Sequence, residues 1–159
     1  MLLIVWHSRT GAARAMARAA WTGARGAGET RRISARTADP AAMLAATGYL
    51  FCCPENLGGL TGTMKEFFDR CYYPLLGQIE GRPYATLIAA GSDGTGAQRQ
   101  LDRIVTGWRL RRVAEPAIVS LAAQTPEAIL AAKTVPEAAL RECFALGAAL
   151  SEGLAHGIF

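Results

Sequence analysis

The chain has 159 residues, of which 51% are hydrophobic and 19% are charged, and its formal net charge is +4. This length and composition are typical of one folded domain and exclude a disordered chain, so we expect a single domain over residues 1–159. No apolar run approaches the ~20 residues of a membrane span. The first residues also lack the basic region and small-residue cleavage site of a signal peptide, so we expect a cytoplasmic protein without membrane contact.

The positive charge is concentrated near the start of the chain. Residues 1–40 carry seven arginines and only two acidic residues. No basic stripe interleaved with aromatic residues accompanies them, so we expect no nucleic-acid partner. Arg14, Arg18 and Arg25 share the polar face of the first predicted helix, and a solvated face is the more frequent interpretation of such a pattern.

The cysteines indicate neither a metal site nor a redox motif. None of the four belongs to a C-x-x-C motif, and the chain has only two histidines, so we expect no metal. Cys52 and Cys53 lie in an apolar run and are predicted to be core residues. Reduced thiols of this kind are typical of a cytosolic protein.

Short apolar runs alternate with amphipathic stretches along the whole chain. The apolar runs with the length of strands are Leu2–Trp6, Gly48–Cys53, Pro83–Ala90 and Ala117–Leu121, and Thr30–Ser34 is predicted as a weak second strand. Helical spacing is found from Ala13 to Gly26, Asp39 to Ala46, Thr63 to Leu75 and Ala97 to Trp108, in a short piece after Thr125, and from Thr134 through Leu154. Because strands alternate with helices, we expect an α/β fold with a parallel sheet covered on both faces.

Three helix starts are predicted from capping signals. Thr63 and Glu66 have the spacing of a capping box, in which a hydroxyl and a carboxylate satisfy free N–H groups of the first turn. Thr95 with Gln98 and Thr134 with Glu137 repeat this spacing. We therefore expect side-chain caps at these three positions.

The turn after the first strand has the features of an anion site. Ser8, Arg9, Thr10 and Gly11 lie between a buried strand and a helix. Such a turn presents unpaired N–H groups and the positive end of a helix dipole at one point, for which phosphate is the usual ligand. An ordinary turn whose hydroxyls cap the helix is the alternative.

Glycine-rich polar loops follow three of the predicted strands, at Trp6, Cys53 and Ala90. The carboxyl ends of parallel strands meet at one edge of a sheet, where ligands bind in open α/β folds. The chain has neither a nucleoside-triphosphate loop nor a G-x-G-x-x-G after its first strand, and residue 59 is a glycine where a phosphatase C-x5-R motif needs arginine. The loops are suited to a flat heterocycle that hydrogen-bonds to main chain.

Three segments resemble the FMN-binding loops of the flavodoxin-like family: S-R-T-G-A-A at 8–13, P-E-N-L-G-G-L-T-G-T-M-K-E-F-F-D-R at 54–70 and A-G-S-D-G-T-G-A-Q at 90–98. Within that family the chain is more similar to the small NAD(P)H-dependent quinone and FMN reductases, including the tryptophan-repressor-binding-protein-like flavoproteins, than to true flavodoxins. The resemblance covers essentially the whole chain. It implies a three-layer sandwich with a five-stranded parallel sheet in the order 2-1-3-4-5.

The resemblance also assigns cofactor-binding positions. It implies that the FMN phosphate is held by Ser8, Arg9, Thr10, Gly11, Ala12 and Ala13. The ring and ribityl chain would be lined by Pro54, Glu55, Asn56, Leu57, Gly58, Gly59 and Gly62. The other edge of the ring would be contacted by Ser92, Asp93, Gly94 and Gly96. No catalytic side chain is implied, because the flavin carries the chemistry.

Ala13 departs from the pattern of the resembled family, which has a threonine there. One hydroxyl donor is therefore missing, worth about 1 kcal/mol net. We expect FMN to bind about tenfold more weakly than usual, unless Arg9 or Arg14 supplies a charge-assisted contact instead.

Three functions are compared. A reductase would pass electrons from NAD(P)H through FMN to a quinone or similar small acceptor, and it needs one open flavin face. The loops Pro54–Gly62 and Gly91–Gln98 contain no Trp, Tyr or Phe, which favours this function over a flavodoxin-type electron carrier with a ring between aromatic residues. A module that has lost its cofactor is the third alternative.

By analogy with the family, we expect a homodimer or homotetramer.

A few further residues have two interpretations each. His7 either pairs with the phosphate or is structural, and the structural role is favoured. Glu55 either tunes the flavin or faces solvent. Trp6 and Tyr72 are predicted to pack, whereas Tyr73 is a candidate substrate-facing aromatic. Asp93 and Arg99 are candidates for contact with either the pyrimidine edge of the flavin or the nicotinamide.

Overall fold

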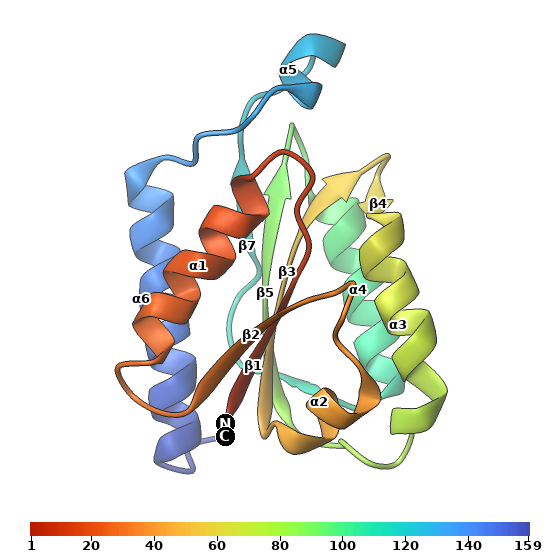
Figure 1. The fold of residues 1–159 in the computed structure, drawn as a ribbon, viewed down its shortest axis with the longest axis vertical. Coiled ribbons are helices and arrows are strands. Elements are labelled where there is room, and N and C mark those ends of the chain that lie inside the picture. The colour runs from red at the N-terminus through yellow and green to blue at the C-terminus, as the bar shows by residue number, and fades with distance from the viewer.

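A computed structural model describes residues 1–159 as a twisted sheet between two layers of helices (Figure 1). The strands are β1 (Leu2–Trp6), β2 (Thr30–Ser34), β3 (Gly48–Asn56), β4 (Gly59–Leu60), β5 (Pro83–Ala90), β6 (Arg111–Arg112) and β7 (Ala117–Ser120). The helices are α1 (Ala12–Ala24), α2 (Pro40–Ala45), α3 (Gly62–Leu75), α4 (Thr95–Gly107), α5 (Pro126–Leu130) and α6 (Glu137–Ala155).

The main sheet is parallel, with β2, β1, β3 and β5 side by side and β6 and β7 both pairing with β5. This confirms the flavodoxin-like class and the strand order, but the sheet has seven strands, not five. The expected fifth position is divided, since β6 pairs with Pro83 and Tyr84 whereas β7 pairs with Leu87 to Ala90. Pro116 precedes β7 and has no N–H to donate to a ladder, which accounts for the interruption. The seventh strand, β4, forms an antiparallel hairpin with β3.

Each face of the sheet buries its own apolar cluster. On one face, α1 and α6 cover side chains such as Leu2, Ile4 and Cys52, and on the other α2, α3 and α4 cover Val5 and Cys53 (Figure 1). The alternation of neighbouring residues between the two clusters follows from the two-residue period of a strand. All four cysteines are buried and unpaired, so the prediction that Cys52 and Cys53 are core residues is confirmed.

The helices α1 and α6 approach each other closely at two glycines. A Cβ on Gly147 would overlap the carbonyl oxygen of Ala20, and a Cβ on Gly23 would overlap that of Phe144. Small residues on the buried stripe of α1 allow this approach, which fixes α1 and therefore the loop that precedes it.

The predicted caps Thr63 and Thr134 are wrong. The hydroxyl of another threonine caps α3, and no side chain caps α6. The cap of α3 is Thr61, whose Oγ1 accepts from Met64 N at 3.4 Å, so the helix begins one residue before Thr63. For α6 the N-cap is Pro136 and no side chain caps it, so Thr134 does not have the predicted role.

The predicted pair of Thr95 and Gln98 is also wrong, because Gln98 belongs to a buried polar network. Its Oε1 accepts from Thr86 Oγ1 at 2.7 Å, and its Nε2 donates to Asp102 Oδ1 at 3.0 Å. Tyr84 donates to the same carboxylate at 2.9 Å, and Arg112 forms an ion pair with it. This network joins α4 to β5 and to the short strand β6.

None of the helices combines the length and the hydropathy that crossing a membrane requires. No group of three or more His, Cys, Asp or Glu side chains is arranged to hold a metal ion.

Candidate functional site

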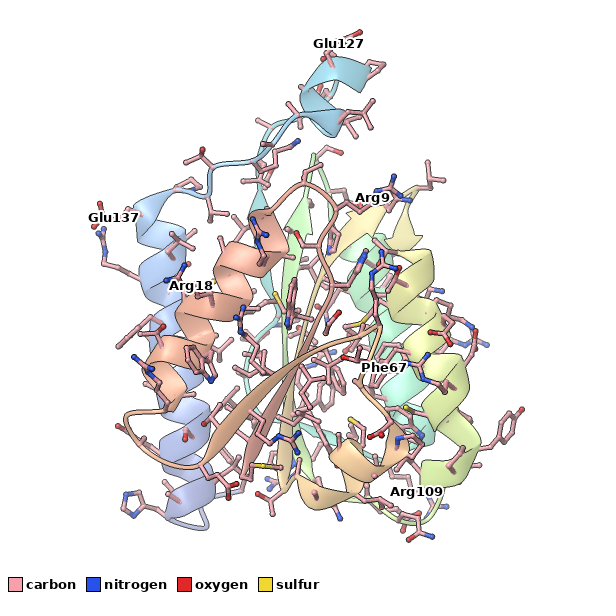
Figure 2. The ribbon with its side chains drawn as sticks, viewed as in Figure 1. Arg9, Arg18, Phe67, Arg109, Glu127 and Glu137 are labelled. Carbon is pink, nitrogen blue, oxygen red and sulfur yellow. The ribbon has the colours of Figure 1, made fainter.

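The predicted loops meet at one end of the sheet. The β1–α1 loop, the β3–β4 hairpin and the β5–α4 loop lie together at the carboxyl ends of the parallel strands, and α5 projects beyond them (Figure 1). Arg9 lies at the same end (Figure 2). The arrangement is the one expected for a ligand site in an open parallel sheet.

The N-terminus of α1 is open. Gly11 is its N-cap, at φ 100°, a left-handed conformation that favours glycine, and no side chain caps the helix. The first helical hydrogen bond runs from Ala15 N to Gly11 O, so the N–H groups of the preceding turn point outward without helical partners. Ser8 Oγ accepts from Gly11 N at 3.1 Å, which folds the loop and leaves the hydroxyl hydrogen of Ser8 free to donate.

The second predicted loop is partly a β-hairpin. We expected β3 to stop at Cys53, but it continues to Asn56, and Glu55 and Asn56 pair with β4. Leu57 and Gly58 form the turn with φ of 53° and 72°, as in the two-residue turns that suit the twist of a hairpin. Pro54 did not end the strand because its missing N–H removes only one ladder bond. The Leu57 side chain is 99% exposed at the tip.

Glu55 has a role that neither of its two interpretations included. Its carboxylate accepts from Gly94 N at 2.9 Å and from Ala97 N at 3.0 Å, and so caps the N-terminus of α4 from a different loop. Leu60 N donates to Gln100 Oε1 at 2.7 Å. These bonds attach the hairpin to the first two turns of α4.

The two helix N-termini at this end of the sheet therefore differ. A carboxylate already occupies the positive end of the α4 dipole, whereas the end of α1 has only main-chain donors and hydroxyls around it. An anionic ligand group is consequently favoured at α1 and disfavoured beside Glu55.

His7 is structural, as the favoured interpretation predicted. It is buried, and its Nδ1 lies 2.9 Å from Thr61 Oγ1. Burial, followed by the charges of Arg36 and Arg9, lowers the pKa of His7. This hydrogen bond connects the residue after β1 to the N-cap of α3, and so links the first two loops.

A pocket with an empty volume of about 590 Å³, part of it open to solvent, lies between the loops. The predicted residues that line it are Ser8, Arg9, Thr10, Ala12, Ala13, Pro54, Glu55 and Asn56. The predicted cofactor-binding residues that line this pocket thus come from two of the three predicted loops.

The remaining predicted residues surround the pocket without lining it. Gly11 borders the neighbouring hollow on the outer side of the first loop. Those of the hairpin and the third loop that do not line the pocket are Leu57, Gly58, Gly59, Gly62, Ser92, Asp93, Gly94 and Gly96. From the third loop only Gly91 reaches the lining, and Gly94 N instead donates to the Glu55 carboxylate.

The sequence analysis missed one wall of the pocket. It consists of residues from the segment after β7, namely Leu121, Ala123, Ile129, Leu130 and Lys133, together with Ala89 and Ala90 at the end of β5. This wall could have been predicted because the segment follows a parallel strand and therefore begins at the same edge of the sheet as the other loops.

The segment that carries α5 is attached to the site by two main-chain bonds. Lys133 N donates to Thr10 O at 2.8 Å, and Ala123 N donates to Gly91 O at 2.8 Å. Between these bonds α5 has no buried residue, and the Leu130 side chain is 71% exposed. The ammonium group of Lys133 donates to carbonyl oxygens of α5, including Ile129 O at 2.9 Å.

Other candidates do not line the pocket. Tyr72 packs, as predicted, with its ring stacked on Trp108 at 5.8 Å between centroids. Tyr73 is 79% exposed and lies about 16 Å along α3 from Gly62, at 1.5 Å per residue, so it does not face this pocket. Asp93 and Arg99 are exposed. Trp6 is half-buried and packs as expected.

No cysteine thiol lines the pocket. Burial raises the pKa of the Cys53 thiol to about 12 and raises that of Cys52 well above its usual range, so both remain protonated. The ionisable groups in the lining are Arg9, Glu55 and Lys133, and the latter two are hydrogen-bonded to main chain.

Comparisons with known proteins agree with this fold. No curated protein matches the chain in sequence. Among solved structures, a flavodoxin from the domain Archaea is 16% identical with a TM-score of 0.78, covering 98% of this chain and 99% of that one. A WrbA-like flavodoxin from Agrobacterium tumefaciens is 18% identical with a TM-score of 0.77, covering 98% and 97%. Two-electron reduced Megasphaera elsdenii flavodoxin is 19% identical with a TM-score of 0.74, covering 96% and 99%.

These identities establish the flavodoxin-like fold alone. The model of the NADPH-dependent FMN reductase family matches residues 35–125, which is more than half of the chain and includes the hairpin, β5 and the third loop. The chain therefore belongs to the NADPH-dependent FMN reductase family.

Proposed function

We propose that the pocket binds FMN and that the protein uses it to pass electrons from NAD(P)H to a quinone or a similar small acceptor. When bound, the flavin supplies the hydride and electron chemistry. The chain supplies a phosphate site, a surface for the ring and an opening for the second substrate.

The observation that carries this proposal is the open N-terminus of α1. Its first turn has no side-chain cap, and Ser8 and Thr10 provide hydroxyls next to it in the pocket lining. A phosphate there would meet main-chain donors and the positive helix end. The Glu55 carboxylate at α4 directs the phosphate away from the other side of the pocket.

The ring would lie between the hairpin and Gly91. Neither Pro54 to Gly62 nor Gly91 to Gln98 contains an aromatic residue, so no side chain of these loops covers a ring face by stacking. A face that is free of aromatic cover is accessible to a nicotinamide and to a flat acceptor. This favours direct reduction by NAD(P)H.

We include an assembly and a location in the proposal. Ile129 and Leu130 line the pocket and are largely exposed, so a second copy of the chain packed over α5 would cover them and enclose the acceptor site.

The four buried, unpaired cysteines are typical of a reducing compartment, and we place the reaction in the cytoplasm.

The test is the visible absorption spectrum of the protein after incubation with excess FMN and desalting, followed by anaerobic addition of NADPH or NADH. We expect flavin bands that survive desalting and are lost on addition of NAD(P)H. Bands that persist with NAD(P)H and are lost only with dithionite would instead support an electron carrier of the flavodoxin type.

A matched pair of variants tests the phosphate site. Ser8→Asp places a carboxylate at the N-terminus of α1, where it would compete with the phosphate, so we expect loss of bound FMN from a folded protein. Thr22→Asp adds the same charge on the exposed side of α1 and should retain FMN. FMN retention by Ser8→Asp, or its absence from the unmodified protein, would refute the proposed site.

A further inference from the structure

A shallow groove runs along the outward face of α1, next to the proposed phosphate site. It has an empty volume of about 1,660 Å³, open to solvent, and it begins at Thr10 and Gly11, which belong to the first loop. From Gly11 to Thr22 it follows the helix for about 16 Å, at 1.5 Å per residue. Its other wall is formed by Leu140, Arg141 and Phe144 of α6 together with Ala132 and Lys133.

Three arginines in this groove have no acidic partner. Arg14 and Arg18 come from α1 and Arg32 from β2, and none of them takes part in any of the five ion pairs of the chain. Their guanidinium groups donate no hydrogen bond to the protein. The acid at the groove, Glu137, is paired with Arg141 at 2.6 Å. Figure 2 shows Arg18 on α1 beside α6.

Arg32 is held in place although the neighbouring charges disfavour it. Its guanidinium lies 5.4 Å from the ring centroid of Trp6 and 5.7 Å from that of Trp21. Burial, followed by the positive charges of Arg18 and Arg14, lowers the pKa of Arg32. A fixed cation beside two like charges is unfavourable in the absence of an anion, so the cluster differs from a solvated face of independent side chains.

We propose that this groove binds the adenosine diphosphate part of a dinucleotide, an inference that rests on the proposed function. Planar guanidinium groups are suited to the paired oxygens of phosphates. The groove is also lined by Ala15, Ala19 and Leu140, and the Phe144 ring is 47% exposed, which provides an apolar surface for a base.

The position of the groove favours a nucleotide over an acidic redox protein. An electron-transfer partner must approach the flavin ring, which we place between the hairpin and Gly91, whereas the groove extends from the opposite, phosphate side of the first loop. A nucleotide that continues from the cofactor site needs the positive charge on that side. The adenylate half of FAD and the adenosine half of NAD(P)H share this chemistry.

The experiment compares ligands in Arg18→Gln/Arg32→Gln, which leaves Arg14 beside the phosphate loop unchanged. The control is Arg103→Gln/Arg111→Gln, which removes two exposed arginines outside the groove. Binding of FMN and FAD is measured by quenching of flavin fluorescence, and binding of ADP-ribose and its 2′-phosphate by calorimetry on FMN-loaded protein. Thermal melting confirms that each variant is folded.

If the source is FAD, the unmodified protein should bind FAD at least tenfold more tightly than FMN, and the groove variant should lose that difference. If the source is NAD(P)H, ADP-ribose or its 2′-phosphate should bind the FMN-loaded protein, and the groove variant should weaken it at least tenfold while its FMN affinity changes less than twofold. The control should match the unmodified protein in both assays.

The inference is overturned if FMN binds but neither nucleotide shows these effects, if the control variant weakens binding as much as the groove variant, or if inorganic phosphate binds as tightly as ADP-ribose. Failure of FMN itself to bind would overturn the proposed function first, so the two failures are distinguishable.

Discussion

Glu55 and Gly94 are 39 residues apart in the chain, and the carboxylate of the first accepts a hydrogen bond from the backbone N–H of the second at 2.9 Å. Ala97 N donates to the other carboxylate oxygen. The contact fixes the hairpin on the start of α4 and fills one of the two positive helix ends beside the pocket. The orientation that we propose for FMN, with its phosphate at α1, depends on this asymmetry.

Replacement of Glu55 by Gln should destabilise the protein and loosen the pocket. The amide can accept one of the two N–H bonds but presents an NH2 group to the other, and hydrogen bonds to charged groups contribute about 1.5–3 kcal/mol. Because Glu55 is partly exposed, we expect a loss of about 1–2 kcal/mol in the free energy of unfolding by urea denaturation. Glu142→Gln, at an exposed position on α6, is the control, and equal stability of the two variants would contradict the capping role.

Replacement of Ala13 by Ser should tighten FMN binding. Ala13 belongs to the pocket lining in the first turn of α1, where it is fully buried, and a hydroxyl directed from there toward the phosphate adds a donor worth about 1 kcal/mol. The dissociation constant of FMN, measured by fluorescence quenching, should fall about fivefold. Ala15→Ser lies on the same helix outside the pocket and should leave it unchanged. No tightening by Ala13→Ser would mean that this side chain does not face the phosphate.

His7 should make the stability depend on pH. Because the pKa of folded His7 is lowered, the unfolded chain takes up a proton, near its ordinary pKa of about 6.5, at a higher pH than the folded chain does. The contribution is fully present above that value and is lost as the pH falls through it toward the lower folded pKa. Between about pH 7.5 and about pH 5.5 the unfolding free energy should therefore decrease.

The two histidines of the chain provide the comparison for this pH effect. His7→Gln should flatten the decrease in unfolding free energy, whereas His156→Gln, at an exposed position, should not. A decrease of the same size in both variants would assign the pH dependence to other groups.

Gly147→Ala should separate α1 from α6. Its Cβ would overlap the carbonyl oxygen of Ala20, a backbone atom that cannot move alone. Overpacking of this kind costs about 1–3 kcal/mol, and we expect a loss of at least about 2 kcal/mol in unfolding free energy. Ala149→Ser, on the exposed side of α6, should change it little. A stable Gly147→Ala protein would show that the helices can move apart without cost.

The sequence predicted those parts of the fold that depend on local pattern. The long helices and four of the five main strand positions follow from helical spacing and apolar runs, which are visible residue by residue, whereas the strand order was implied by the family resemblance. Pro116 divided the last strand, and this effect could have been inferred because proline has no N–H to donate. The extension of β3 through Pro54 could not, since it depends on the pairing of Glu55 with Leu60.

The pocket was predicted where the lining comes directly after a strand, at Ser8 to Thr10, Ala12, Ala13 and Pro54 to Asn56. The roles of Glu55 and Gln98 were missed because their partners, Gly94 and Thr86, lie in other elements. Capping signals read from sequence assume local partners, and at both residues the bond that forms in the fold is nonlocal. The wall from Leu121 to Lys133 was missed because the segment has no glycine-rich signature.

The attachment of α5 by Ala123 and Lys133 has a consequence for local unfolding. The segment between these residues has almost no buried surface to oppose its opening, so its amides should exchange with deuterium long before those of the core strands. Both attachment bonds end on loops of the pocket, at Gly91 and Thr10. A ligand that rigidifies those loops should therefore slow exchange throughout residues 124–132, and hydrogen-exchange mass spectrometry of this one peptide would report occupancy of the pocket even for ligands that have no colour.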